Sequence, residues 1–288
     1  VRAGLFKTED SRIISNMVVY ICNPCVVVHS FQIELTDDKI KGLMIAIGLS
    51  VVVHMVLIIG SEILSFIFHF NSIEKASIIY TNAGYLVIPL VGAVLGEEWV
   101  FYTTAFILVQ TVLMWTHGVK LIGQEKELNI RKILCNPNVI AMIIGIALFA
   151  LEIRLPTVVD SCVSGFGDMI SPASMMVIGM VIGDVDLKWV FRQKRPYLIC
   201  LLRLIVFPLI AVVAFAGLER SGIHPDAEYI LMIVLIATSA PAAAMITQLA
   251  QIYGKDSRYA SVINVMSVIF CIITMPVMVL SYEMLIAL

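Results

Sequence analysis

Long apolar runs, separated by short polar segments, dominate the sequence. A helix needs about 20 apolar residues to cross the hydrocarbon core of a bilayer. Measured against that length, the pattern predicts nine membrane spans. They cover residues 13–33, 43–68, 76–95, 99–121, 137–152, 157–183, 197–217, 228–252 and 260–285. The predicted fold class is therefore an all-α polytopic membrane protein.

Composition and charge support this interpretation. Of the 288 residues, 60% are hydrophobic and only 14% are charged, whereas a soluble domain is about half apolar and about a quarter charged. Lys and Arg concentrate in cytoplasmic loops. If the chain starts in the cytoplasm, fourteen Lys and Arg fall on the cytoplasmic side and four outside. We therefore expect a multi-pass protein of the cytoplasmic membrane, with residues 123–136 in the cytoplasm and the C-terminus outside.

The polar segment 123–136 divides the chain into two halves. Residues 1–122 contain four predicted spans, and residues 137–288 contain five. The chain begins with Val1 and a loop-like polar segment, so we expect one further span before it, which makes ten. Two halves of five spans each have opposite orientations in the membrane and form an inverted repeat.

Two polar interruptions lie inside otherwise apolar spans. TNAGYLVIPLVG, residues 81–92, belongs to the third span, and ATSAPAAA, residues 237–244, belongs to the eighth. A broken helix inside a membrane is tolerated only where protein or a polar cavity surrounds it. We expect breaks within 82–89 and within 238–242, lying within about 10 Å of each other near the midplane. The alternative is a simple proline kink in each continuous helix.

Two such breaks predict a site for an anion. The half-helix after each break begins with free N–H groups and about half a positive charge, and Pro241 suits the first turn of such a helix. Neither interruption contains a carboxylate, so a backbone anion site fits better than a cation site. The predicted substrate-binding residues are Asn82, Ala83, Gly84, Pro89, Thr238, Ser239, Ala240, Pro241, Ala242 and Asn23.

Three polar residues in other spans leave alternatives open. Asp168, in GFGDMISP, is a proton carrier, a cation ligand or a buried cap over a glycine-rich turn. Arg203 either extends to the inner interface or balances the charge of a substrate. Asn23 precedes Pro24 and either offers its amide to the substrate or marks a kink. Asp168 and Arg203 are the ion-coupling candidates.

Three segments resemble one family of transporters. NAGYLVIPLVG, SPASMMVIGMVIG and SAPAAAMITQLAQIYGKD are similar to the auxin efflux carrier family, which includes plant PIN carriers and many bacterial permeases. The resemblance implies ten helices in two inverted five-helix repeats, with a scaffold part and a transport part that holds two crossing broken helices. It also implies organic anions as substrates: auxin in plants, and dicarboxylates such as malate or malonate for some bacterial members. The chain lacks the long cytoplasmic loop of many plant carriers and so resembles a bacterial permease.

We therefore expect a secondary transporter of a small organic anion, coupled to H⁺ or Na⁺. The alternative is a cation/proton antiporter of similar architecture, which needs paired acids beside the crossing. No HExxH or GxSxG motif occurs, so we do not expect an enzyme. Cys22 and Cys25 have CxxC spacing without a second pair, and we expect no metal, cofactor or nucleic acid. We expect membrane lipid to surround the protein, either as a single chain or as a homodimer.

Overall fold

The computed structural model describes residues 10–34, 36–123, 131, 134–170, 172–173, 176, 180 and 187–287. Within these residues every regular element is a helix, and one isolated antiparallel bridge joins Thr81 to Ala242. The predicted all-α polytopic membrane fold is confirmed. Four stretches in the described part are long and apolar enough to cross a membrane, namely residues 37–68, 97–123, 195–219 and 257–286.

The first half of the chain forms its spans from several consecutive helices. They are α1 (Asp10–Met17), the π-helical turn η1 (Val18–Cys22), α2 (Asn23–Ser30), α3 (Asp37–Phe68), α4 (Ser72–Ile79), α5 (Ala83–Val94), η2 (Glu97–Trp99), α6 (Val100–Leu113), η3 (Met114–Gly118) and α7 (Val119–Gly123). The first span stays helical through Asn23, because η1 leads directly into α2. The third span is split into α4 and α5.

The second half is built in the same way. It contains α9 (Pro137–Ala150), α10 (Thr157–Asp168), α12 (Leu187–Arg192), α13 (Arg195–Leu201), the π-helical turn η4 (Leu202–Val206), α14 (Phe207–Glu219), α15 (Ala227–Ser239), α16 (Ala244–Ile252) and α17 (Ser257–Ile286). The eighth span is split into α15 and α16. Much of the second part of the predicted sixth span lies outside the described residues, as does most of the linker 123–136.

Polar side chains fix where several helices begin. Asn71 and Glu74 form a capping box at the start of α4, in which each side chain accepts a hydrogen bond from the other residue's backbone N–H. Asn136 accepts from the amide of Asn138 at 2.9 Å and caps α9, with Pro137 in the first turn. Such caps satisfy N–H groups that have no partner within the helix.

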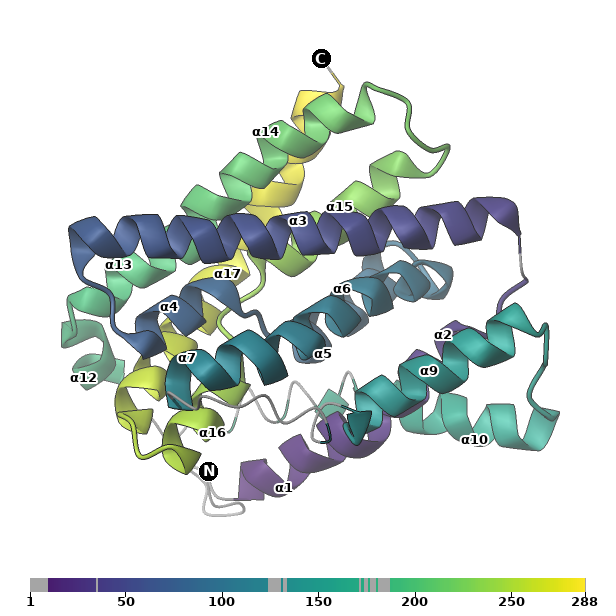
Figure 1. The fold of residues 1–288 in the computed structure, drawn as a ribbon, viewed down its shortest axis with the longest axis horizontal. Coiled ribbons are helices and arrows are strands. Elements are labelled where there is room, and N and C mark those ends of the chain that lie inside the picture. Colours follow the sequence, from purple (N-terminus) through teal and green to yellow (C-terminus); the bar gives the residue numbers. More distant parts are fainter. Residues whose placement is uncertain are drawn as a thin grey trace.

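The helices fall into two groups, which do not follow the two halves of the chain (Figure 1). In the smaller group, α2 packs against α9 and α10. The larger group contains α3 to α7 and α13 to α17 and holds both split spans. This division agrees with the scaffold and transport parts implied by the resemblance. Phe31 and Phe149 of the smaller group contact Phe101 of α6, with ring centroids 5.1 and 5.4 Å from that of Phe101.

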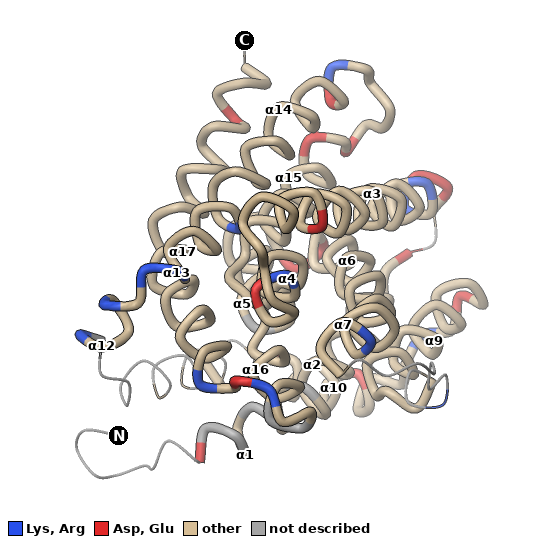
Figure 2. The backbone as a smooth tube through the Cα atoms, turned by 60° about the vertical axis from the view of Figure 1, so that its left-hand side comes forward, with Lys and Arg blue, Asp and Glu red and all other residues tan. Residues whose placement is uncertain are grey.

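Charged residues lie mainly near the ends of the helices, and the middles of the helices are largely uncharged (Figure 2). The start of α3 and the end of α14 lie at one end of the molecule, whereas α12, α13 and α16 lie at the other (Figure 1). This arrangement agrees with the alternation of spans that the charge pattern predicts. The membrane side of each end remains a prediction.

Candidate functional site

The two helix breaks meet each other directly. The first leaves Tyr80, Thr81 and Asn82 outside the helices, and the second leaves residues 240–243 outside. The amide of Asn82 donates to the carbonyl of Pro241 at 2.8 Å, and the amide of Ala243 donates to the carbonyl of Tyr80 at 3.0 Å. The prediction that two broken spans cross at one point is confirmed. The first break, at 80–82, lies earlier than the predicted window 82–89 and shares only Asn82 with it.

The outer edges of this short bridge are closed by side chains. Thr81 and Ala242 face each other as a non-hydrogen-bonded pair, so their own N–H and C=O groups point away from the bridge. Gln110 of α6 closes the Thr81 edge: its Oε1 accepts from the Thr81 amide at 2.8 Å and its Nε2 donates to the Thr81 carbonyl at 2.9 Å. On the Ala242 edge, Ser267 of α17 accepts from the amide at 3.1 Å, and Asn264 donates to the carbonyl at 2.6 Å.

Arg203 is fully buried and lies on the side of the crossing where α4 and α15 end. Its Nε donates to the carbonyl of Ala240 at 3.2 Å and its Nη1 to the carbonyl of Ile78 at 3.1 Å. These carbonyls end α15 and α4, where helix dipoles are negative. No ion pair between Arg203 and a carboxylate occurs among the described residues. The interpretation that Arg203 extends to the membrane interface is wrong. Its hydrogen bonds to the C-terminal ends of α4 and α15 hold the guanidinium group in the protein interior.

The opposite, N-terminal ends of α5 and α16 face a small pocket. No described residue accepts a hydrogen bond from the amides of Ala83, Gly84, Ala244 or Met245. The pocket has a volume of about 100 Å³. We call it the amide pocket, because five of the residues that line it carry side-chain amides: Asn23, Asn82, Gln110, Asn136 and Asn138. None of the described side chains that line it is charged.

The smaller helix group reaches the amide pocket through Asn23. Its Nδ2 lies 2.7 Å from the position that a Cβ atom on Gly84 would occupy. Glycine is therefore required for this close approach between α2 and α5. The Oδ1 atom of Asn23 is buried without a partner among the described residues. Asn23 does not break its helix. It contributes a side-chain amide where the two helix groups meet, which we call the seam.

The predicted site residues separate into three sets. Asn23, Asn82 and Gly84 line the amide pocket, and Ala83 lies buried in the first turn of α5. Ala240, Pro241 and Ala242 form the backbone of the crossing, while Thr238 and Ser239 end α15 and are fully covered by protein. Pro89 is elsewhere.

Two expectations about proline are corrected by the structure. Pro241 is not in the first turn of α16; it lies in extended backbone three residues earlier, where its carbonyl accepts from Asn82. Pro89 does not mark a break, because it lies within α5. A proline removes only one hydrogen bond from the helix, and other groups in a membrane protein compensate for that loss.

Pro89 and Asp168 line a second pocket, which we call the acidic pocket. It has a volume of about 550 Å³ and is also lined by Glu97 and Glu98. Asp168 is exposed to it at the end of α10, so the interpretation of Asp168 as a buried cap is wrong. The two ion-coupling candidates lie apart, because Arg203 does not line this pocket.

Gln110, Asn264 and Ser267 were not predicted as site residues. Their signal in the sequence is weak, because each is one of several scattered polar residues in a largely apolar span. Only the tertiary structure shows that each bonds to backbone freed by a break in another span.

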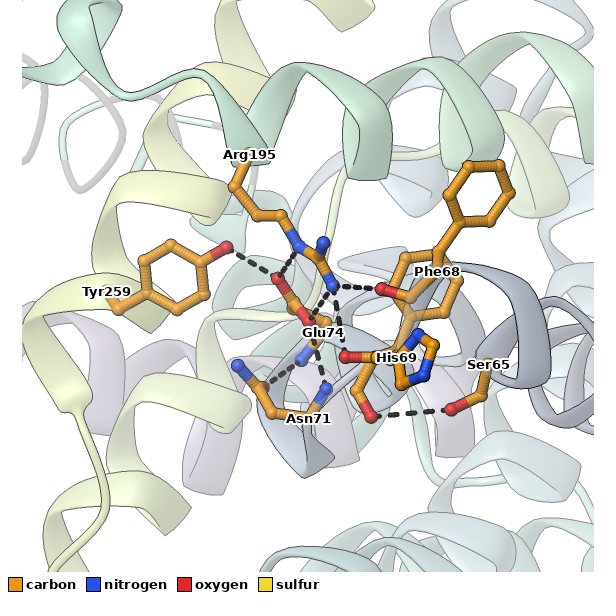
Figure 3. A network of polar contacts seen from close by, with 8 residues as sticks. Ser65, Phe68, His69, Asn71, Glu74, Arg195 and Tyr259 are labelled. Atoms are coloured by element: carbon orange, nitrogen blue, oxygen red, sulfur yellow. Dashed lines mark hydrogen bonds and ion pairs between the residues drawn. The ribbon is translucent and has the colours of Figure 1, made fainter.

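A further polar network lies at the start of α4 (Figure 3). Glu74 is buried and accepts hydrogen bonds from Arg195 Nε at 2.8 Å and from the Tyr259 hydroxyl at 2.7 Å. Arg195 also donates to the carbonyl of Phe68 at 2.6 Å. The network joins the first halves of α4, α13 and α17. It fixes the far end of the half-helix that leads into the first break.

Two crossing broken helices within a polytopic fold are typical of secondary transporters. The family described as "Membrane transport protein" matches residues 1–129 and 125–279 of the chain. The protein belongs to this family, the auxin efflux carrier family, and is a membrane transporter. A comparison with curated proteins gives no match.

Proposed function

We propose that the protein is a secondary transporter that moves a small organic anion across the cytoplasmic membrane by alternating access. The observation that carries this proposal is the amide pocket at the N-terminal ends of α5 and α16. Two half-helices direct free N–H groups to one small, uncharged pocket. Helix N-termini of this kind bind carboxylates and phosphates.

The charge distribution around the crossing favours an anion over a cation. Each half-helix contributes about half a positive charge at its N-terminal end. The negative ends of α4 and α15 are bonded to Arg203 on the other side of the crossing. A cation beside the crossing would therefore meet positive helix ends and a guanidinium group. Side-chain amides suit an anion that must also be released, because they donate hydrogen bonds without adding charge.

Both pockets lie at the seam between the two helix groups. The amide pocket contains Asn23 of α2 and Asn82, while the acidic pocket contains Ser164 of α10 and Pro89 of α5. Asn23 and Gly84, which both line the amide pocket, bring α2 and α5 into close contact there. A movement of one group along the other would open one pocket and close the opposite one, which is the requirement for alternating access.

The second candidate function is a cation/proton antiporter. It is favoured by the carboxylates of Glu97, Glu98 and Asp168 around the acidic pocket. Those carboxylates lie apart from the crossing, where an antiporter of this architecture would need them. The anion transporter is therefore the better supported proposal, and H⁺ or Na⁺ coupling through the acidic pocket is compatible with it.

A ligand-stabilisation screen of the purified protein tests this proposal. The panel contains monocarboxylates, dicarboxylates such as malate and malonate, and matched Na⁺ and Li⁺ salts of an inert anion. We expect a carboxylate to raise the thermal unfolding midpoint, and the same carboxylate to exchange across proteoliposome membranes. Stabilisation by Na⁺ or Li⁺ alone, with Na⁺/H⁺ exchange and no carboxylate flux, would favour the antiporter.

The proposed orientation has its own test. We propose that the linker 123–136 is cytoplasmic and that the C-terminus is outside, from the charge bias of the loops. In a background cleared of native cysteines, Asn129→Cys should not react with an impermeant thiol reagent in intact cells. Efficient labelling without permeabilisation would refute the orientation.

A further inference from the structure

The bridge between the two breaks has two edges whose backbone N–H and C=O groups point away from it. On each edge these groups bond to side chains of the span that follows the broken span in the sequence. Thr81 belongs to the third span and is closed by Gln110 of the fourth. Ala242 belongs to the eighth span and is closed by Asn264 and Ser267 of the ninth. The third and eighth spans correspond in the inverted repeat, as do the fourth and ninth. The edge contacts are thus repeated in both halves.

The Thr81 edge depends on a single side chain. Gln110 binds three groups of Thr81: its Oε1 accepts from the amide and from the hydroxyl, both at 2.8 Å, and its Nε2 donates to the carbonyl at 2.9 Å. Thr81 is itself buried, with 1% of its surface exposed. Without Gln110, its N–H and C=O groups would have no partner and no access to bulk water, an arrangement that folded proteins avoid.

A continuous helix is the simplest way for the chain to recover those bonds. If residues 80–82 became helical, α4 would continue into α5, and the free N–H groups at Ala83 and Gly84 would find acceptors in the preceding turn. Half of the positive potential at the amide pocket would then disappear. Gln110 thus favours the broken arrangement over the continuous one.

We propose that Gln110 is a positioning residue, which holds the first break open and so keeps the N-terminal end of α5 directed at the amide pocket. Asn264 and Ser267 perform the same task for α16. The role of Gln110 in shaping the pocket rests on the proposed anion site, whereas its role in holding the break does not. The two parts can therefore be tested separately.

The first experiment measures the potential at the amide pocket. The reporter is Ala244→Cys in a protein cleared of its six native cysteines. Its reaction rates are measured with the anionic 2-sulfonatoethyl and the cationic 2-trimethylammonioethyl methanethiosulfonates, each divided by the rate with a free thiol. Two positive helix ends should favour the anionic reagent by about tenfold. Gln110→Met, which has a similar shape and no hydrogen-bonding amide, should reduce this preference to about threefold, because the N-terminal end of α16 keeps its half of the potential.

Thr116→Val is the matched control. Thr116 lies in the same span, and the hydroxyl bonds that it makes within the described residues go to carbonyls of that span, at Val112 and Leu113. It should leave the preference unchanged. An undiminished, about tenfold preference in a folded Gln110→Met protein would overturn the positioning role. A reporter protein with no preference at all would overturn the anion site, and the second experiment would still decide the role of Gln110.

The second experiment uses Gln110→Glu and the thermal unfolding midpoint. A protonated Glu side chain reproduces all three bonds, because its carbonyl accepts and its hydroxyl donates to Thr81. An ionised side chain has no donor and places a negative oxygen beside the Thr81 carbonyl. Stability relative to the unmodified protein should therefore be greatest at low pH and decrease as pH rises through the pKa of the new carboxyl.

We expect a small difference between Gln110→Glu and the unmodified protein at about pH 5, and a midpoint lower by about 5 °C or more at about pH 8.5. His54 of α3 faces Gln110, and Arg203 lies close to His54. Because a new carboxylate would change the ionisation of His54, the comparison is repeated with His54→Gln in both proteins. A difference that is equal at the two pH values, including one of zero, would overturn the role of the three bonds to Thr81.

Discussion

The amide of Asn82 donates a hydrogen bond to the carbonyl of Pro241 at 2.8 Å, which joins the breaks of two spans from opposite halves of the chain. The bond uses the backbone of Asn82 and leaves its side chain facing the amide pocket. One residue thus contributes to both the crossing and the pocket. The backbone contact fixes the position from which the side-chain amide can reach a ligand.

Replacement of Asn82 by Leu should weaken carboxylate binding with little change in the fold. The bridge bonds of Asn82 come from its backbone and remain available to Leu. The side-chain amide forms no hydrogen bond with a described residue, so its loss leaves no described group unpaired. We expect binding weaker by about 1.5–3 kcal/mol, the range for a hydrogen bond to a charged group. Calorimetry with the carboxylate selected by the screen provides the measurement, and an unchanged affinity would make this amide structural.

Replacement of Gly84 by Ala should disturb the seam between the helix groups. The new Cβ would lie 2.7 Å from Asn23 Nδ2, so the Asn23 side-chain amide must shift from its position in the amide pocket. We expect carboxylate flux in proteoliposomes to fall by about tenfold or more, comparable with the loss of one hydrogen bond to a charged group. Gly48→Ala in α3 is the control, because no atom lies within 4 Å of its added Cβ. Equal flux in the two variants would contradict a functional seam at Asn23.

Replacement of Arg203 by Met should destabilise the protein. Met has a long apolar side chain, but it leaves the carbonyls of Ile78 and Ala240 without their donors inside the membrane. We expect a loss of about 3 kcal/mol in unfolding free energy, since buried carbonyls that lose a charged donor remain unpaired. Arg203→Lys keeps the charge with a single nitrogen and should lose less. Thermal unfolding of the two variants in detergent tests this order, and a Met variant as stable as the Lys variant would contradict it.

Glu74 and Glu62 offer a direct comparison of a buried and a partly exposed carboxylate. Glu74 is 2% exposed and bonds to Arg195 and Tyr259, whereas Glu62 pairs with Lys75 at 2.7 Å and its side chain is 48% exposed. Glu74→Gln should cost about 1.5–3 kcal/mol, the range for hydrogen bonds to charged groups, because Arg195 loses its counter-charge but keeps a side chain that is 42% exposed to solvent. Glu62→Gln should cost about 0.5 kcal/mol or less, as is usual for exposed pairs. Similar unfolding midpoints for the two variants would contradict a stabilising role for the network in Figure 3.

The sequence predicted the spans and the crossing well, because apolar length and polar interruptions act locally along the chain. The predicted structural roles of Pro89 and Pro241 were wrong. A proline indicates a lost backbone hydrogen bond, but it does not show how neighbouring helices compensate for that loss. Arg203 was ambiguous for the same reason: its acceptors, Ile78 and Ala240, belong to other spans.

The partners Gln110 and Asn264 were not predicted at all. Each is a single amide in an apolar span, and the sequence does not show which backbone group another span leaves unpaired. Such contacts depend on how the helices pack, and packing is a property of the whole fold. The crossing was therefore predictable in its backbone and not in the side chains that support it.

The central claim is that a small organic anion binds at the N-terminal ends of α5 and α16. A structure of the protein with the carboxylate selected by the screen tests this claim most directly. We predict carboxylate oxygens within hydrogen-bonding distance of the amides at Ala83 or Gly84 and at Ala244 or Met245, with the Asn82 side chain in contact. A ligand bound in the acidic pocket beside Asp168, with the amide pocket unchanged and empty, would contradict the account.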